Sequence, residues 1–105
     1  MKKNHTPDRQ QVLIDLYKQY LFSEITLGQL LSYLRKNVLG MTQEQYAVLI
    51  GVSRRTLTDI EQDKGKPTQS VLDKVFKPLG LKAGLVPTHE HIVEKIIKPT
   101  NEESV

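Results

Sequence analysis

Two adjacent arginines, Arg54 and Arg55, are the residues whose type and spacing most clearly suggest chemistry. They follow Ser53, a preferred helix cap, and the spacing of Leu57 and Ile60 predicts a short helix behind it. Both arginines therefore stand in the first helical turn, where the partial positive charge of the helix N-terminus disfavours cations. A charge run is usually only a solvated face, but an anionic partner would relieve this repulsion. The outward residues of this predicted helix are Arg54, Arg55, Thr58 and Asp59.

A helix-turn-helix pattern positions these arginines. Two short helices joined by a tight turn cross at a steep angle, which requires a small residue where the backbones approach and a glycine in the turn. Ala47 and Gly51 supply them. The remaining inward positions are all apolar: Tyr46, Ile50, Val52, Leu57 and Ile60. Two unrelated core helices would explain the apolar residues, but not Ala47 and Gly51 at these offsets.

Helix caps predict a mainly α chain with five consecutive helices. The first runs from Thr6, the N-cap before Pro7, to Phe22. Thr26 and Thr42 each precede a glutamine by three residues, which is the spacing of a capping box. Gly40 ends the second helix and Gly51 the third, Ser53 begins the fourth, and Thr68 caps a fifth that Pro78 ends. Residues 89–98 are expected to add a further helical turn or two.

Residues 80–87 change to a period of two and predict one short β-strand. Leu81, Ala83 and Leu85 form one side of it, and Pro87 ends it. A lone strand has no partner for its backbone groups, and the same strand of a second subunit across a two-fold axis would supply one. These three residues are therefore the predicted dimerisation residues.

Composition limits the alternatives. With 105 residues and 38% hydrophobic residues, the chain has room for one small core, and surfaces are expected rather than deep pockets. The absence of cysteine excludes disulfides, cysteine-based zinc sites, thiolate nucleophiles and iron–sulfur clusters. No catalytic set or cofactor motif is found, and His5, His89 and His91 have no partners at metal-ligand spacing. We therefore expect no enzyme activity, cofactor or metal, no signal peptide, membrane span or membrane partner, and a cytoplasmic location.

The segment TQEQYAVLIGVSRRTLTDIEQDKGKP, residues 42–67, resembles the helix-turn-helix of phage repressors and Cro, the XRE family. The resemblance implies a lambda-repressor-like DNA-binding domain whose second motif helix enters the major groove. Arginine can bind guanine O6 and N7, a threonine methyl can contact the thymine methyl, and aspartate can accept from a cytosine amino group. Arg55 is the leading base-reading candidate. The full set implied is Ser53, Arg54, Arg55, Thr58 and Asp59.

The same resemblance implies phosphate contacts and an internal ion pair. Arg35 and Glu61 are expected to pair and to tie the second helix to the end of the recognition helix. Residues 35–66 carry six basic and four acidic side chains, against a net charge of +3 for the chain, so we expect a modest salt dependence per subunit. Lys2 and Lys3 are a candidate flexible arm. The predicted phosphate contacts are Gln43, Lys64, Lys66 and Thr68, with Gly65 in the same loop.

The run FKPLGLKAGLVP, residues 76–87, is similar to the C-terminal part of HipB-like antitoxins, in which a short strand pairs with its mate in the dimer. Those antitoxins repress their own operon and hold a HipA-like kinase toxin. The resemblance covers residues 24–87, with two departures. The segment LRKNVLGMTQ, residues 34–43, is one residue longer than usual, and the helix at 6–22 is not part of the family core. That helix either packs on its own subunit or docks the kinase or a companion subunit.

The sequence therefore predicts an N-terminal extension helix (1–25), a helix-turn-helix domain (26–79), a dimerisation strand (80–87) and a C-terminal tail (88–105). The predicted function is a homodimeric, sequence-specific repressor that binds double-stranded DNA with inverted repeats, as the antitoxin of a HipBA-like system. Two alternatives stay open. One is an antitoxin whose main role is to bind a kinase toxin or companion subunit, and the other is a lone XRE-type regulator.

Overall fold

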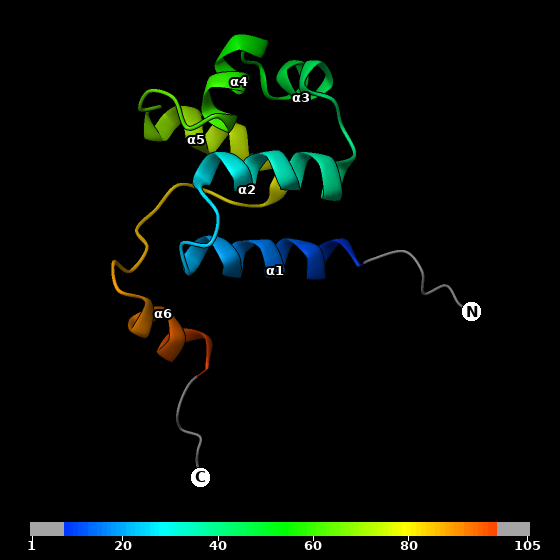
Figure 1. Ribbon diagram of the computed structural model, residues 1–105. Helices are drawn as coiled ribbons and strands as arrows, with labels where there is room; N and C mark the ends of the chain where they lie inside the picture. Colours follow the sequence, from blue (N-terminus) through cyan, green and yellow to red (C-terminus); the bar gives the residue numbers. More distant parts are fainter. Residues whose placement is uncertain (1–7, 99–105) are drawn as a thin grey trace, which may run out of the picture.

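The computed structural model describes residues 8–98, which are mainly helical, as predicted (Figure 1). The helices are α1 (Arg9–Leu21), α2 (Leu27–Leu34), α3 (Gln43–Ile50), α4 (Arg54–Glu61), α5 (Gln69–Phe76) and α6 (Glu90–Ile97). A π-helical turn, Arg35–Leu39, continues α2, and a 3-10 turn, Lys77–Leu79, continues α5. In Figure 1, α3 and α4 lie at the top, α2 lies below them, and α1 lies below α2. Helix α6 lies apart from α3 and α4, at the lower left.

The predicted caps begin four of these helices. Thr26 and Thr42 both form complete capping boxes with the glutamines that follow them. The Ser53 hydroxyl accepts a hydrogen bond from the Thr56 N–H at 3.0 Å, and the Thr68 hydroxyl accepts one from the Val71 N–H at 3.1 Å. These starts are confirmed because a cap depends only on residues within one turn.

The start of α1 differs from the prediction. The helix begins at Arg9, and its N-cap is Asp8, whose carboxylate accepts a hydrogen bond from the Gln10 N–H at 3.1 Å. Aspartate caps a helix at least as well as threonine does. The expected cap Thr6 and Pro7 lie outside the described residues, as do His5, the arm at Lys2 and Lys3, and the end of the predicted tail.

The strand predicted over residues 80–87 is not observed, and the described part of the chain contains no strand. Its backbone makes other bonds instead. The Leu81 N–H donates to the Phe76 carbonyl at 3.2 Å, and the Ala83 N–H donates to the Asp73 Oδ1 at 2.7 Å. Within one chain no neighbouring strand lies beside this segment, so no ladder forms.

The extra residue in the 34–43 segment coincides with the π-helical turn. A π turn closes its hydrogen bonds over five residues and so accommodates one residue more than an α turn does. The Gly40 N–H donates to the Arg35 carbonyl, and Gly40 ends the turn with a left-handed backbone, φ 62°. The Met41 N–H donates to the same carbonyl at 3.1 Å.

The core lies among α2, α3, α4 and α5. Its buried residues are Leu30, Leu31, Leu34, Tyr46, Ala47, Ile50, Leu57, Ile60, Val75, Phe76 and Leu79. Helix α1 covers one side of this core with four half-buried side chains, Leu13, Leu16, Tyr17 and Tyr20. The helix therefore packs on its own subunit, and docking of a partner stays a prediction.

Helices α2 and α4 approach closely at Gly28. A Cβ atom there would lie 2.5 Å from the Glu61 carbonyl oxygen, so only glycine fits. Asp63, with a positive φ of 59°, holds the same junction from the end of α4. Its carboxylate accepts hydrogen bonds from the Gly28 N–H at 2.9 Å and from the Thr26 hydroxyl at 2.5 Å.

Candidate nucleic-acid interface

The turn between α3 and α4 has the geometry that the sequence predicts. Gly51 adopts a left-handed backbone, φ 73°, and its N–H donates to the Ala47 carbonyl at 2.9 Å. The Val52 N–H donates to the same carbonyl at 3.1 Å. Ala47, Leu57 and Ile60 are all buried where the two helices face each other. This turn places the first residues of α4 on the surface beside the first residues of α3.

Arg54 is paired within the chain. Its Nη1 lies 2.6 Å from Oε2 of Glu44, the second residue of α3, and both side chains are about three-fifths exposed. Its Nε donates to Gln43 Oε1 at 3.4 Å. Arg54 is therefore an outward residue, as predicted, but one whose charge is compensated.

Gln43 connects this exposed pair to the interior. Its amide nitrogen donates to the Glu61 Oε1 at 3.0 Å. The amide oxygen consequently faces α4, where it accepts hydrogen bonds from Arg54 and from the Thr58 hydroxyl, the latter at 3.3 Å. Gln43 was predicted as a phosphate contact, and its side chain is hydrogen-bonded to three residues of α4.

Glu61 and Arg35 form a buried ion pair below Gln43. The guanidinium donates from Nε to Oε2 at 2.7 Å and from Nη2 to Oε1 at 3.0 Å, and both side chains are 6% exposed. The Arg35 Nη1 also donates to the Met41 carbonyl at 2.7 Å, across the π turn. Nearby, burial raises the pKa of Tyr46 to about 12, with Glu61 adding to the rise and Arg35 opposing it.

Arg55 is exposed and, among the described residues, forms no ion pair or side-chain hydrogen bond. Asp59 is half-buried further along α4, and Ser53 uses its hydroxyl as the cap. Lys64 and Lys66 are exposed in the loop after α4, and Thr68 caps α5 beyond it.

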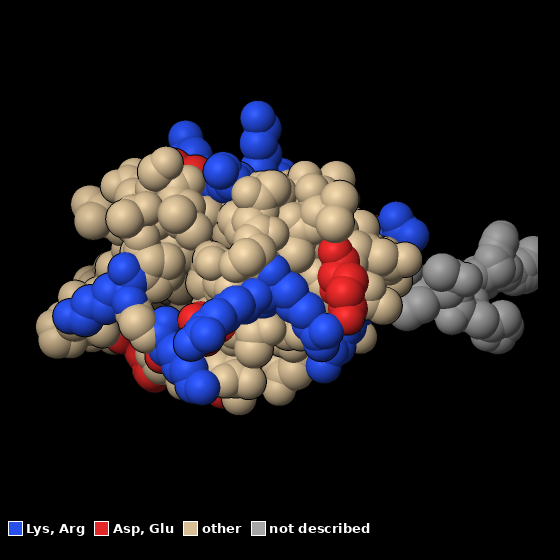
Figure 2. All heavy atoms as spheres, turned by 90° about the horizontal axis from the view of Figure 1, so that it is seen from above, with Lys and Arg blue, Asp and Glu red and all other residues tan. Residues whose placement is uncertain are grey.

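Figure 2 looks onto the end of the molecule where α3 and α4 lie, and Lys and Arg side chains cross this face. The largest acidic area in that view lies at the edge of the basic side chains.

Glu44 is the residue at this site that sequence reasoning missed. The signal was present, since a carboxylate in the first turn of the first motif helix precedes an arginine in the first turn of the second. The helix-turn-helix crossing brings those two turns together. Hydrogen bonds and an ion pair therefore connect four residues of this site, Gln43, Glu44, Arg54 and Thr58. Arg55 follows Arg54 in the sequence and takes no part in these contacts.

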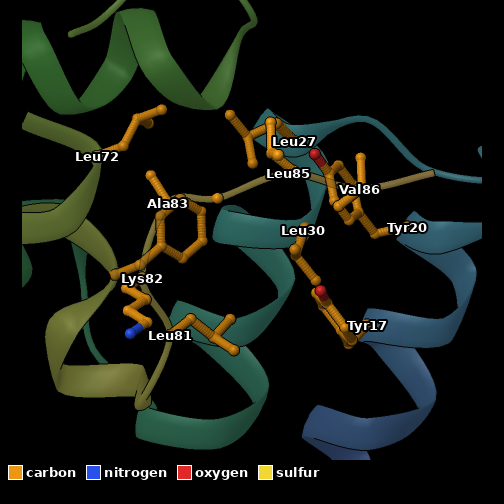
Figure 3. A pocket seen from close by; sticks show the side chains of 12 residues that line it. Tyr17, Tyr20, Leu27, Leu30, Leu72, Leu81, Lys82, Ala83, Leu85 and Val86 are labelled. Atoms are coloured by element: carbon orange, nitrogen blue, oxygen red, sulfur yellow. The ribbon is translucent and has the colours of Figure 1, made fainter. Parts of the chain in front are cut away.

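The predicted dimerisation residues lie elsewhere, beside a pocket of about 250 Å³. Tyr17 and Tyr20 of α1 line one side of it and Leu72 of α5 the other, as Figure 3 shows. Leu81 and Ala83 are half-buried, whereas Leu85 is fully exposed. Residues 81–86 thus cover part of the core and present an apolar side chain to solvent.

Within residues 8–98, no helix is long and apolar enough to cross a membrane, and no group of three or more His, Cys, Asp or Glu side chains is placed to hold a metal ion. His89 and His91 stack with ring centroids 5.6 Å apart.

A crossed helix pair with a left-handed glycine between them, a buried crossing and basic residues at the start of the second helix defines a helix-turn-helix protein. The family model described as helix-turn-helix matches residues 31–85, more than half of the sequence, and this chain belongs to that family. The match supports the XRE type and a DNA-binding transcription regulator. No curated protein and no solved structure matches the chain.

Proposed function

We propose that this chain is a sequence-specific transcriptional repressor that binds inverted-repeat DNA as a homodimer. The observation that carries the base-reading role is Arg55, an exposed arginine in the first turn of α4 without a partner in the described chain. A guanine edge offers two acceptors that match its guanidinium. Lys64 and Lys66, exposed in the next loop, are placed to contact phosphates and fix the register of α4 in the groove.

Residues 81–86 support the homodimer. Leu81 and Ala83 are the only residues of this segment whose backbone N–H groups have a partner in the described chain, and both partners lie on α5. A two-fold copy of the segment would satisfy the remaining groups and would cover Leu85. Half-sites are then expected about 34 Å apart, one turn of DNA, or a multiple of that distance.

Gel-shift titration of two alanine variants tests the proposed contacts. The probe is a duplex that the wild-type protein enriches from a random pool. Arg55→Ala should weaken binding to this enriched duplex by about 1–3 kcal/mol, and should relax base preference at one position in each half-site. Lys66→Ala should weaken binding to the enriched duplex and to a scrambled duplex alike. Equal losses on both duplexes for Arg55→Ala would show that Arg55 does not read bases.

We further propose that the regulator is the antitoxin of a HipBA-like system and represses its own operon. The support is the similarity of residues 76–87 to HipB-like antitoxins, together with the exposed Leu85 in that segment. DNase footprinting upstream of the gene tests autoregulation. Co-purification with a kinase-like product of the neighbouring reading frame tests the toxin partner.

Two other outcomes of these experiments are informative. Kinase binding without a footprint favours an antitoxin whose main role is to bind the kinase or a companion subunit. A footprint without a kinase-like neighbour favours a lone XRE-type regulator.

A further inference from the structure

Glu44 and Arg54 form an ion pair on the face that we assign to DNA. The carboxylate and the guanidinium are 2.6 Å apart, and about three-fifths of each side chain is open to solvent. The Arg54 Nε also donates to Gln43 Oε1 at 3.4 Å. The orientation of Gln43 is fixed because its amide nitrogen donates to the buried Glu61. Arg54 therefore has two acceptors within its own chain.

This arrangement makes the two adjacent arginines unequal. Arg55 has no partner among the described residues, so its guanidinium is available to DNA bases and phosphates alike. Arg54 keeps free N–H donors on Nη2 while it is paired, but the adjacent Glu44 carboxylate compensates its charge and repels any phosphate that approaches. To act on DNA with its full charge, Arg54 must leave Glu44. The exchange is unfavourable unless the DNA offers Arg54 good acceptors at a fixed position. Guanine O6 and N7 are such acceptors, and they occur only in particular sequences.

We propose that Glu44 is a specificity-determining residue that keeps Arg54 from binding DNA phosphates. On DNA of unrelated sequence, Arg54 stays paired with Glu44 and releases no counterion. On the correct site, close docking of α4 replaces the Glu44 carboxylate with base acceptors. Glu44 thus weakens binding to all sequences but weakens it more for the wrong ones. This inference rests on the proposed DNA-binding function.

Salt titrations of Glu44→Gln test the proposal, with the wild-type-enriched duplex and a scrambled duplex of equal composition as probes. Glutamine keeps the shape of the side chain and removes its charge. Glu90→Gln is the matched control, since Glu90 is an exposed carboxylate in the first turn of α6, another eight-residue helix. Arg54→Gln and the double variant complete a cycle that isolates the pair.

In Glu44→Gln, Arg54 is no longer paired and adds about one phosphate contact per subunit. The plot of log affinity against log salt concentration should then be steeper by about 0.9. When the salt is raised from about 50 to about 200 mM, both variants should bind the scrambled duplex more weakly. The loss of affinity should be about threefold larger, per subunit, for Glu44→Gln than for Glu90→Gln. At low salt the variant should bind the scrambled duplex more tightly, and its preference for the enriched duplex should fall. Removal of Arg54 should abolish the change in slope.

The proposal is overturned if Glu44→Gln behaves as Glu90→Gln does, or if it tightens binding to both duplexes equally. It is also overturned if Glu44→Gln changes the salt slope as much in the Arg54→Gln background as in the wild-type background. Glu44 would then act only by repelling the DNA phosphates and not through Arg54. A wild-type protein that enriches no duplex would instead contradict the proposed sequence-specific function itself.

Discussion

At the scale of single residues, Gln43 links a buried charge to the exposed face of α4. Its amide nitrogen donates to Glu61, and its amide oxygen accepts from Arg54 and Thr58. The Arg35–Glu61 pair therefore does more than join two helices, because it fixes which end of the Gln43 amide faces the recognition helix. The Gln43 side chain can contact a phosphate without leaving these partners only through the second N–H of its amide.

Tyr46 gives the molecule a pH dependence at alkaline pH. The side chain is fully buried, its hydroxyl donates to the Val75 carbonyl at 2.5 Å, and burial raises its pKa from 10.0 to about 12. The folded state keeps this proton between pH 10 and 12, where the unfolded chain loses it. The stabilisation is therefore complete below pH 10 and is lost as the pH rises toward 12, by on the order of 2 kcal/mol.

Urea denaturation at pH 9 and pH 11.5 measures this effect. Tyr46→Phe should lose about 1 kcal/mol at pH 9, since the Val75 carbonyl loses its donor, and should lose less further stability than the wild-type protein at pH 11.5. Tyr33→Phe, at a half-buried position of α2, is the control and should follow the wild-type protein. An equal loss of stability in Tyr46→Phe and the wild-type protein on going to pH 11.5 would contradict the assignment.

At the scale of elements, the contact between α2 and α4 sets the position of the recognition helix. Gly28→Ala would place a methyl group 2.5 Å from the Glu61 carbonyl oxygen and 2.6 Å from that of Ile60, both backbone atoms that cannot turn aside. The two helices must separate, and we expect a loss of about 1–3 kcal/mol or more in the free energy of unfolding. Thermal and urea denaturation measure it.

Gly84→Ala is the control for this prediction, because nothing lies within 4 Å of the added methyl group. It should leave the stability nearly unchanged. Equal stability of the Gly28→Ala variant and the wild-type protein would mean that α2 and α4 do not approach this closely.

The elements also show what could be predicted from the sequence. The caps at Thr26, Thr42, Ser53 and Thr68 are local, and all four are observed. The start of α1 was misplaced because Asp8 competes with Thr6 for the same role. The ion pair of Glu44 depends on the crossing of two helices rather than on one turn. The strand at 80–87 was inferred from an alternating pattern, which records how side chains are distributed and not whether a neighbouring strand is present.

At the scale of the whole molecule, the chain has a net charge of +3, and its described part contains one helix-turn-helix, so the proposed function leaves a single subunit few contacts with DNA. Strong binding to one inverted repeat then requires two subunits held at a fixed spacing. The exposed side chain of Leu85, beside backbone groups without partners in the described chain, marks where we propose that the second subunit joins.

Leu85→Lys tests this assembly without disturbing the core. The leucine is fully exposed in the single chain, so the substitution should leave the monomer stable. In a two-fold dimer it places two like charges at the interface and removes apolar contact, so sedimentation should show a dimer for the wild-type protein and a monomer for the variant. Affinity for an inverted repeat should fall, whereas affinity for an isolated half-site should stay within about twofold, because each head keeps its own contacts.

Val48→Lys is the control, because Val48 is also a largely exposed apolar residue but lies on α3, which contributes no residue to the pockets that residues 81–86 line. It should sediment as the wild-type protein does. If Leu85→Lys remains a dimer, or if the wild-type protein is a monomer that still prefers the inverted repeat to a half-site, subunits do not associate through this segment. Since Arg55 lies on α4 and not in residues 81–86, either result would leave its proposed base-reading role to be decided by its own variant.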